Sequence, residues 1–159
     1  MTQKLLSTQP LPVYVQGGIG IHTVAASRVA GAAGVILDDQ LLLMPESPLP
    51  GEWQRYLNNL NGTEAIAIGE ILNASCRVLS RPGFQVITSV QQQASQLEVE
   101  YETSEEGTQR WQQQARSSIG WGAPGIQAWP IGQSVGLAES FRDRYKTTGR
   151  LVQALLEAS

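Results

Sequence analysis

Two short clusters of residues near the start of the chain have types and a spacing that suit chemistry. Gly17, Gly18, Ile19 and Gly20 place three glycines in four positions, so the backbone can turn tightly and its N–H groups stay uncovered by side chains. Such groups bind anions when a helix follows, because the helix dipole directs positive potential to the same point. The loop therefore predicts a phosphate site for a phosphorylated cofactor. A tight strand–helix turn without a ligand is the alternative.

A strand, a helix and a second strand must position this loop. Residues 12–16 (PVYVQ) are rich in β-branched and aromatic side chains and predict a buried strand. Residues 23–32 predict an Ala-rich helix that Gly31 and Gly34 close, and residues 35–37 predict a second buried strand. The sequence thus predicts one strand–loop–helix–strand unit of an α/β fold, with the glycine loop at the start of its helix.

Composition predicts a globular, cytoplasmic protein. Of the 159 residues, 42% are hydrophobic and 16% charged, and the net charge of −3 without a basic cluster argues against nucleic acid as a partner. Cys76 is the single cysteine, which fits a reducing compartment. No apolar run is long enough for a membrane helix, and the first residues lack the apolar core of a signal peptide. No membrane partner is expected.

The remaining chain predicts further elements by period and by its Gly and Pro breaks. Residues 1–9 predict the end of a helix, 52–60 a helix, and 65–68 and 75–79 short strands. Residues 86–97 and 108–118 are Gln-rich and predict helices with a solvated face, or else a linker. Apolar stripes predict helices at 137–145 and 151–156. We therefore expect three regions, residues 1–84, 85–118 and 119–159.

The segment GGIGIHTVAASRVAGAAGVILDDQL (residues 17–41) resembles the phosphate-binding part of the nitronate monooxygenase family, formerly called 2-nitropropane dioxygenases. Members of this family are FMN-dependent (β/α)8 barrels. VQGGIGIHT, VILDDQLLL and WPIGQSVGLAESFRDRYKTTGRLVQAL resemble more narrowly the nitronate monooxygenase-like domain of some modular polyketide synthases. Because 159 residues are too few for a complete barrel, the resemblance implies a partial TIM barrel, its last βαβ units, with a mostly helical C-terminal region.

The resemblance also implies a cofactor site. Residues 12–16 would be the seventh barrel strand and residues 35–37 the eighth, and the loop glycines with Ile19 would bind the FMN phosphate, where barrels commonly place one. Stand-alone members end the eighth strand in a Gly-Thr pair that also holds the phosphate. Asp38, Asp39 and Gln40 stand there instead, so Asp38 and Gln40 become candidate cofactor contacts. A carboxylate repels a phosphate unless it turns away or binds through water or a cation.

The function implied by the resemblance is the FMN-binding part of a flavin oxidoreductase tied to polyketide or lipid synthesis. Its small-molecule substrate would be a nitronate or another acidic C–H compound, or an enoyl group to be reduced. The family's catalytic histidine lies upstream, and His22, the only histidine, does not match its motif. No catalytic residue is therefore assigned, and an upstream half-barrel or a larger synthase chain is the expected partner. The alternative function is a structural or docking domain that keeps the fold without FMN.

Other interpretations of the same residues stay open. A dinucleotide fold would use Asp38, twenty residues after Gly18, to bind a ribose, although Thr23 stands where that fingerprint needs glycine. Asp38 with its neighbour Asp39 lacks the His or Cys cluster of a metal site, so no metal is predicted. Cys76 predicts a small buried apolar residue. Trp121 and Trp129 predict core anchors, or covers for a ligand beside their Gly/Pro loops.

Overall fold

The computed structural model describes residues 10–101 and 104–158, which form two compact units. The first unit contains residues 10–62 and 133–158, and the second contains residues 63–132. The predicted helix end in residues 1–9 lies outside the described residues. The predicted regions 1–84, 85–118 and 119–159 divide the chain by sequence character, and that division stays a prediction.

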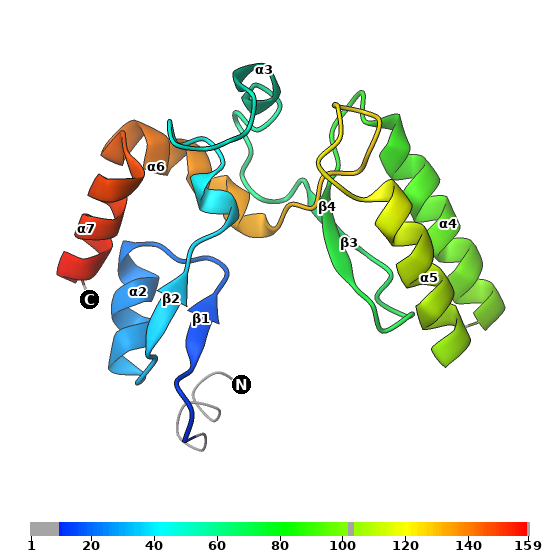
Figure 1. Ribbon diagram of the computed structural model, residues 1–159, viewed down its shortest axis with the longest axis horizontal. Helices are drawn as coiled ribbons and strands as arrows, with labels where there is room; N and C mark the ends of the chain where they lie inside the picture. Colours follow the sequence, from blue (N-terminus) through cyan, green and yellow to red (C-terminus); the bar gives the residue numbers. More distant parts are fainter. Residues whose placement is uncertain (1–9, 102–103, 159) are drawn as a thin grey trace. The chain divides into compact units, whose positions relative to one another are not determined.

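A two-stranded parallel sheet organises the first unit (Figure 1). Strand β1 (Tyr14–Gln16) pairs with β2 (Gly34–Ile36) in parallel, with Tyr14 opposite Gly34 and Gln16 opposite Ile36. Helix α2 (Ile21–Val29) connects the strands and covers one face of the sheet. A parallel pair needs such a crossover. The predicted strand–loop–helix–strand unit is confirmed, with a helix that begins two residues earlier than the sequence indicated. The prediction that both strands are buried is wrong: Tyr14, Gln16 and Ile36 are exposed and the other strand residues are partly buried, because α2 covers one face of the sheet only.

C-terminal helices complete the core of the first unit. A 3-10 helix η2 (Gln133–Leu137) is followed by α6 (Ala138–Tyr145) and α7 (Thr148–Ala158), whose predicted apolar stripes contribute to this core. Helix α7 packs on α2 and on α6. Burying one large apolar side chain contributes about 1.5–3 kcal/mol. The cluster comprises Ile19, Val24, Met44, Phe141, Tyr145, Leu151 and Leu155. The glycine loop is therefore anchored on this core through one of its own residues, Ile19.

The helix predicted over residues 52–60 is wrong beyond its first turn. The structure has a one-turn helix α3 (Gly51–Gln54), after which the chain continues in turns. Asn59 takes a left-handed conformation (φ 59°), which asparagine tolerates better than most residues. Its N–H donates to the Glu139 Oε2 of α6 at 3.0 Å, and Arg142 donates to Asn58 Oδ1 at 2.9 Å. These tertiary bonds replace the helical ones, although the spacing still buries Leu57.

Glu46 caps the start of α7. Its carboxylate accepts the Thr148 N–H at 3.2 Å and the Thr148 hydroxyl at 3.0 Å, and the backbone bond lowers the pKa of this carboxyl below its ordinary value of 4.5. A lowered pKa adds stability above the ordinary value, and this stability is lost as the pH falls through the folded value. Glu46→Gln should therefore lower the thermal midpoint more at neutral pH than near about pH 3, because protonation of the wild-type carboxyl removes part of the difference between the two proteins as the pH falls. Thermal unfolding followed by circular dichroism at both pH values checks this; equal losses would contradict it.

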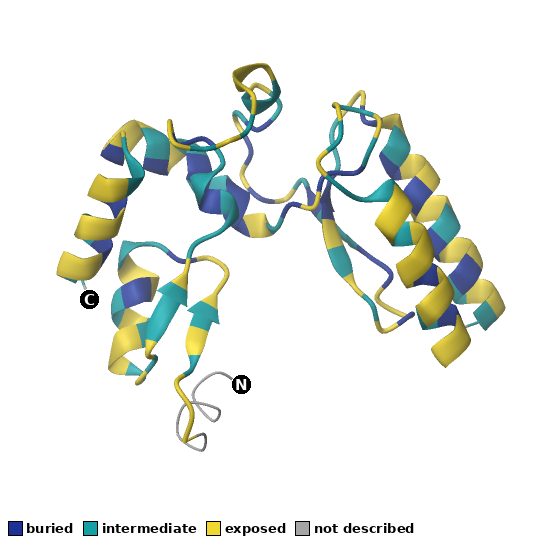
Figure 2. Cartoon of the chain, viewed as in Figure 1, coloured by how far each residue is buried: buried dark blue, intermediate teal, exposed yellow. Residues whose placement is uncertain are grey.

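A helical hairpin on a β-hairpin forms the second unit. Strands β3 (Ala65–Ile68) and β4 (Cys76–Leu79) pair antiparallel, and α4 (Gln85–Tyr101) and α5 (Glu105–Ser118) pack against each other. The Gln-rich residues are thus helical in their described part, which rules out the linker. Figure 2 shows exposed outer faces along both helices and buried residues between them.

Among the described helices, none is both long and apolar enough to cross a membrane.

Candidate functional site

The glycine loop joins the end of β1 to the start of α2 and presents open backbone. Gly17 and Gly18 have φ values of 90° and 62°, a left-handed region that disfavours residues with a side chain. A Cβ on either glycine would meet nothing within 4 Å, and both residues are exposed. The first half of the loop therefore requires glycine for its conformation and leaves its backbone accessible.

The second half of the loop is engaged within the protein. Ile19 is only 1% exposed and packs in the core. The Gly20 N–H donates to the Thr23 hydroxyl oxygen at 2.6 Å, and that hydroxyl lies 2.9 Å from the Gly18 carbonyl oxygen. Gly18 and the first N–H groups of α2, which a helix leaves without helical partners, are thus better placed to receive an anion than Ile19. The cofactor roles of Gly17, Gly18, Ile19 and Gly20 stay predictions.

A hollow of about 320 Å³ lies over this loop. Its lining combines the end of the glycine loop and the start of α2 with polar and aromatic residues of α6, and it contains no carboxylate. Its residues are Gly18, Gly20, Ile21, His22, Thr23, Leu137, Ser140, Phe141, Arg144 and Tyr145. A helix N-terminus and a guanidinium facing one hollow favour an anion electrostatically. Phosphate is the anion that the glycine loop predicts, and the hollow supplies a cation, Arg144, for it.

Arg144 and Ser140 were not found from the sequence. They lie more than a hundred residues downstream, on the polar face of a helix whose apolar face is the detectable signal. Arg144 stacks its guanidinium 5.4 Å from the centre of the Tyr145 ring, an arrangement that orients the cation without removing its charge. Only the packing of α6 near the loop brings these side chains to the site.

Asp38 and Gln40 lie at the end of β2 but not in the lining of the hollow. The Asp38 carboxylate accepts three hydrogen bonds: from Gln16 Nε2 at 2.7 Å, from the Asp39 N–H at 2.7 Å and from the Ser134 hydroxyl at 3.0 Å. Gln40 is fully buried. The repulsion expected between Asp38 and a phosphate is thus reduced, because this carboxylate is turned toward donors of the protein itself.

The remaining residues singled out in the sequence, Cys76, Trp121 and Trp129, show no arrangement for catalysis or metal binding. Among the described residues, no group of three or more His, Cys, Asp or Glu side chains could hold a metal ion. Burial raises the pKa of the half-buried Cys76 thiol, which keeps it protonated and weakly nucleophilic. Trp129 is fully buried against Phe84 and Trp121 in the second unit, as a core anchor. Trp121, the outer member of this cluster, stays partly exposed.

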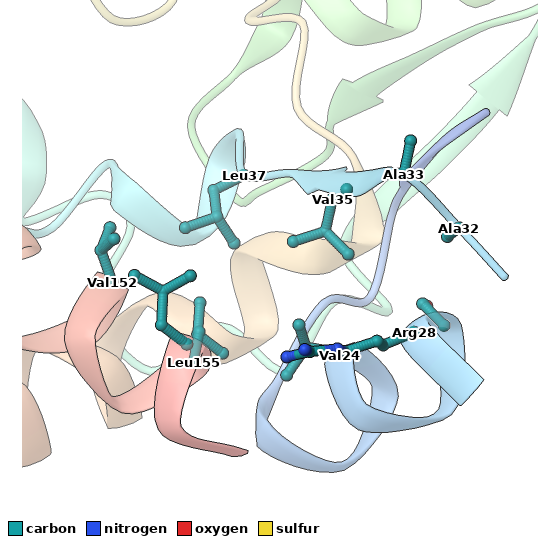
Figure 3. A pocket seen from close by; sticks show the side chains of 11 residues that line it. Val24, Arg28, Ala32, Ala33, Val35, Leu37, Val152 and Leu155 are labelled. Carbon is teal, nitrogen blue, oxygen red and sulfur yellow. The ribbon is translucent and has the colours of Figure 1, made fainter. Parts of the chain in front are cut away.

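A second cavity, of about 550 Å³, opens between α2, β2 and α7 (Figure 3). Val35 of β2 and Leu37, just after this strand, face it together with Val24 of α2 and Leu155 of α7. Its polar side chains are Ser27 and Arg28, and it contains none of the predicted site residues. The cavity is therefore an apolar space without an acid–base or nucleophilic pair.

Comparison with known proteins gives a fold and no family. No family model matches the sequence, and no curated protein matches it. The structure is similar to that of FabK from Thermotoga maritima, with a TM-score of 0.69 and 20% identity over 99% of this chain and 47% of FabK. A point mutant of the same protein gives a TM-score of 0.64 and 19% identity over 98% and 44%. The chain thus has an α/β fold similar to part of the FabK TIM barrel, and spans about half the length of FabK.

Proposed function

We propose that this chain is the FMN-phosphate-binding part of a nitronate monooxygenase-like flavin oxidoreductase. The observation that carries the proposal is the carboxylate-free hollow at the glycine loop, which Gly18, the start of α2 and Arg144 line together. Similarity to part of the FabK barrel supports the fold, and the resemblance of residues 17–41 supports the cofactor.

The residues present fit the phosphate end of FMN. Gly18 offers open backbone, the start of α2 offers helix N–H groups, and Arg144 offers a side-chain donor in the same hollow. Ser140 lines the hollow as well, but its hydroxyl donates to the Leu137 carbonyl at 2.9 Å. Such a set favours a phosphate electrostatically. FMN, when bound, would supply the redox chemistry of its flavin ring. The residues of this chain would hold and orient the cofactor, while the catalytic base would come from elsewhere.

The sheet of the first unit supports an incomplete barrel. Parallel sheets are normally covered on both faces, whereas here the face opposite α2 exposes Tyr14 (58%) and Ile36 (44%). The chain also covers less than half of FabK. We therefore propose that an upstream half-barrel, on a partner chain or in a larger synthase, adds parallel strands and the base. Substrates of nitronate or enoyl type, and association with polyketide or lipid synthesis, are parts of the same proposal.

A structural or docking domain without FMN is the second candidate. The observation that favours it is the engagement of the Gly20 N–H by Thr23, which removes one predicted phosphate donor. The two candidates differ in one property, because only the first predicts that FMN binds at the hollow.

Arg144→Gln tests the proposal. The variant should weaken FMN binding about tenfold, or about 1.4 kcal/mol, because it removes the cation of the hollow. Quenching of flavin fluorescence on titration gives the affinity. Arg150→Gln is the matched control, since Arg150 is an exposed arginine of α7 outside the hollow. Equal weakening by both variants would show a general charge effect and refute the assignment.

A further inference from the structure

The turn after β2 makes hydrogen bonds to the end of β1 and to the glycine loop. At the start of the loop, Gln16 donates from Nε2 to Asp38 Oδ2 at 2.7 Å. Inside the loop, the Ile19 carbonyl accepts a hydrogen bond from Gln40 Nε2 at 3.4 Å. Two residues of the turn, Asp38 and Gln40, thus hold the end of β1 and the glycine loop through their side chains.

Gln40 has its hydrogen-bonding groups committed inside the protein. Its Oε1 accepts the Asp38 N–H at 2.9 Å while Nε2 reaches Ile19, and the residue is 0% exposed. A buried amide costs stability unless such partners are present. Because the side chain spans from the turn to the loop, it fixes the distance between the two backbones at this end of the sheet.

Asp38 extends the same network to the C-terminal segment. Its Oδ1 accepts the Ser134 hydroxyl at 3.0 Å, and Ser134 lies in η2, directly before α6. The helix that carries Arg144 is therefore connected through one carboxylate to the segment that begins the glycine loop. Both sides of the hollow are tied to the turn, although neither Asp38 nor Gln40 lines it.

We propose that Gln40 and Asp38 are positioning residues for a phosphate site and do not touch the ligand. This inference rests on the proposed function and assigns to the turn a supporting role in place of the direct contact made by the Gly-Thr pair of the resembling family. Gln40 sets the position of Ile19 and with it the conformation of the loop. Asp38 fixes the position of the segment before α6 relative to the start of the loop, through its hydrogen bonds with Ser134 and Gln16.

Gln40→Met tests the positioning role of Gln40 in the full chain, because methionine keeps the size of the side chain and removes both hydrogen bonds. Amide hydrogen exchange of Gly20, whose N–H donates to the Thr23 hydroxyl in the free protein, should become about tenfold faster. FMN affinity should fall about tenfold as well. The Leu151 N–H, which bonds the Thr147 carbonyl in the same unit, reports opening away from the loop, and its exchange should accelerate less than that of Gly20. Gln54→Met is the matched control, since the side-chain amide of Gln54 donates one hydrogen bond, to the Leu49 carbonyl, away from the loop.

The outcomes separate this inference from the proposed function. Exchange that accelerates more in the loop than at Leu151, together with weaker FMN binding, supports both. The positioning role of Gln40 is overturned, whether or not FMN binds, if loop exchange is unchanged. It is also overturned if exchange at Leu151 accelerates as much as exchange in the loop. Unchanged FMN affinity despite a loosened loop overturns it too. If the wild-type chain binds no FMN, the proposed function fails, and the exchange pattern alone decides whether Gln40 positions the loop. Ser134→Ala, a smaller change, gives a second test through Asp38 and should also speed loop exchange.

Discussion

Gly69→Ala is expected to destabilise the second unit by about 3 kcal/mol, a large fraction of the stability of a small domain. A Cβ at this position would collide with the Trp111 indole, reaching its Nε1 and lying 2.7 Å from its Cε2. Trp111 cannot move aside easily, since it is 1% exposed and donates from Nε1 to the Ala74 carbonyl at 3.0 Å. The left-handed backbone of Gly69 (φ 74°) adds strain for any side chain.

Gly83→Ala separates the collision from the strain. Gly83 also has a left-handed backbone (φ 93°), but a Cβ there would meet nothing within 4 Å. We expect this control to lose only about 1 kcal/mol, the backbone cost alone. Urea unfolding followed by tryptophan fluorescence measures both variants. Equal losses would mean that Trp111 does not pack on Gly69.

Gly20→Val is expected to weaken FMN binding about a hundredfold while the protein stays folded. Gly20 has an extended backbone (φ −136°) that valine accepts, and its Cβ would lie 3.9 Å from Phe141 Cζ, an ordinary contact. The new methyl groups would therefore enter the hollow, which both residues line. The effect is steric, so it should exceed that of losing the Arg144 charge.

The control for this variant is Gly51→Val, at an exposed position in the same unit where a Cβ meets nothing within 4 Å. Flavin titration and circular dichroism of both variants make the comparison. An FMN affinity of Gly20→Val within about twofold of wild type would place the cofactor elsewhere.

Local patterns were sufficient to predict the elements around the loop. The β-branched run at residues 12–16, the glycines that follow it and the Ala-rich helix each have a local signature, and the structure contains the two parallel strands and the helix between them. The Gln-rich helices and both strands of the second unit were predicted for the same reason. Residues 52–60 failed because the bond of Asn59 to Glu139, eighty residues away in sequence, overrides helical spacing.

The walls of the candidate site could not be predicted from local patterns. Arg144 has no sequence signal that separates it from other arginines on exposed helix faces, and it enters the hollow only because α6 packs near α2. From the sequence alone, the carboxylate of Asp38 was expected to repel a phosphate. Its hydrogen bonds from Gln16 and Ser134 could not be foreseen, because both donors are far from Asp38 in sequence. The burial of Gln40 likewise depends on tertiary packing.

The measurement that tests the central claim most directly is a titration of the folded wild-type chain with FMN and, in parallel, with riboflavin, which lacks the phosphate. The account predicts saturable FMN binding, at least about tenfold tighter than riboflavin binding and competed by inorganic phosphate, because the hollow at Gly18 and Arg144 recognises the phosphate. A chain shown by circular dichroism to be folded that binds neither flavin, or binds both equally, would contradict it.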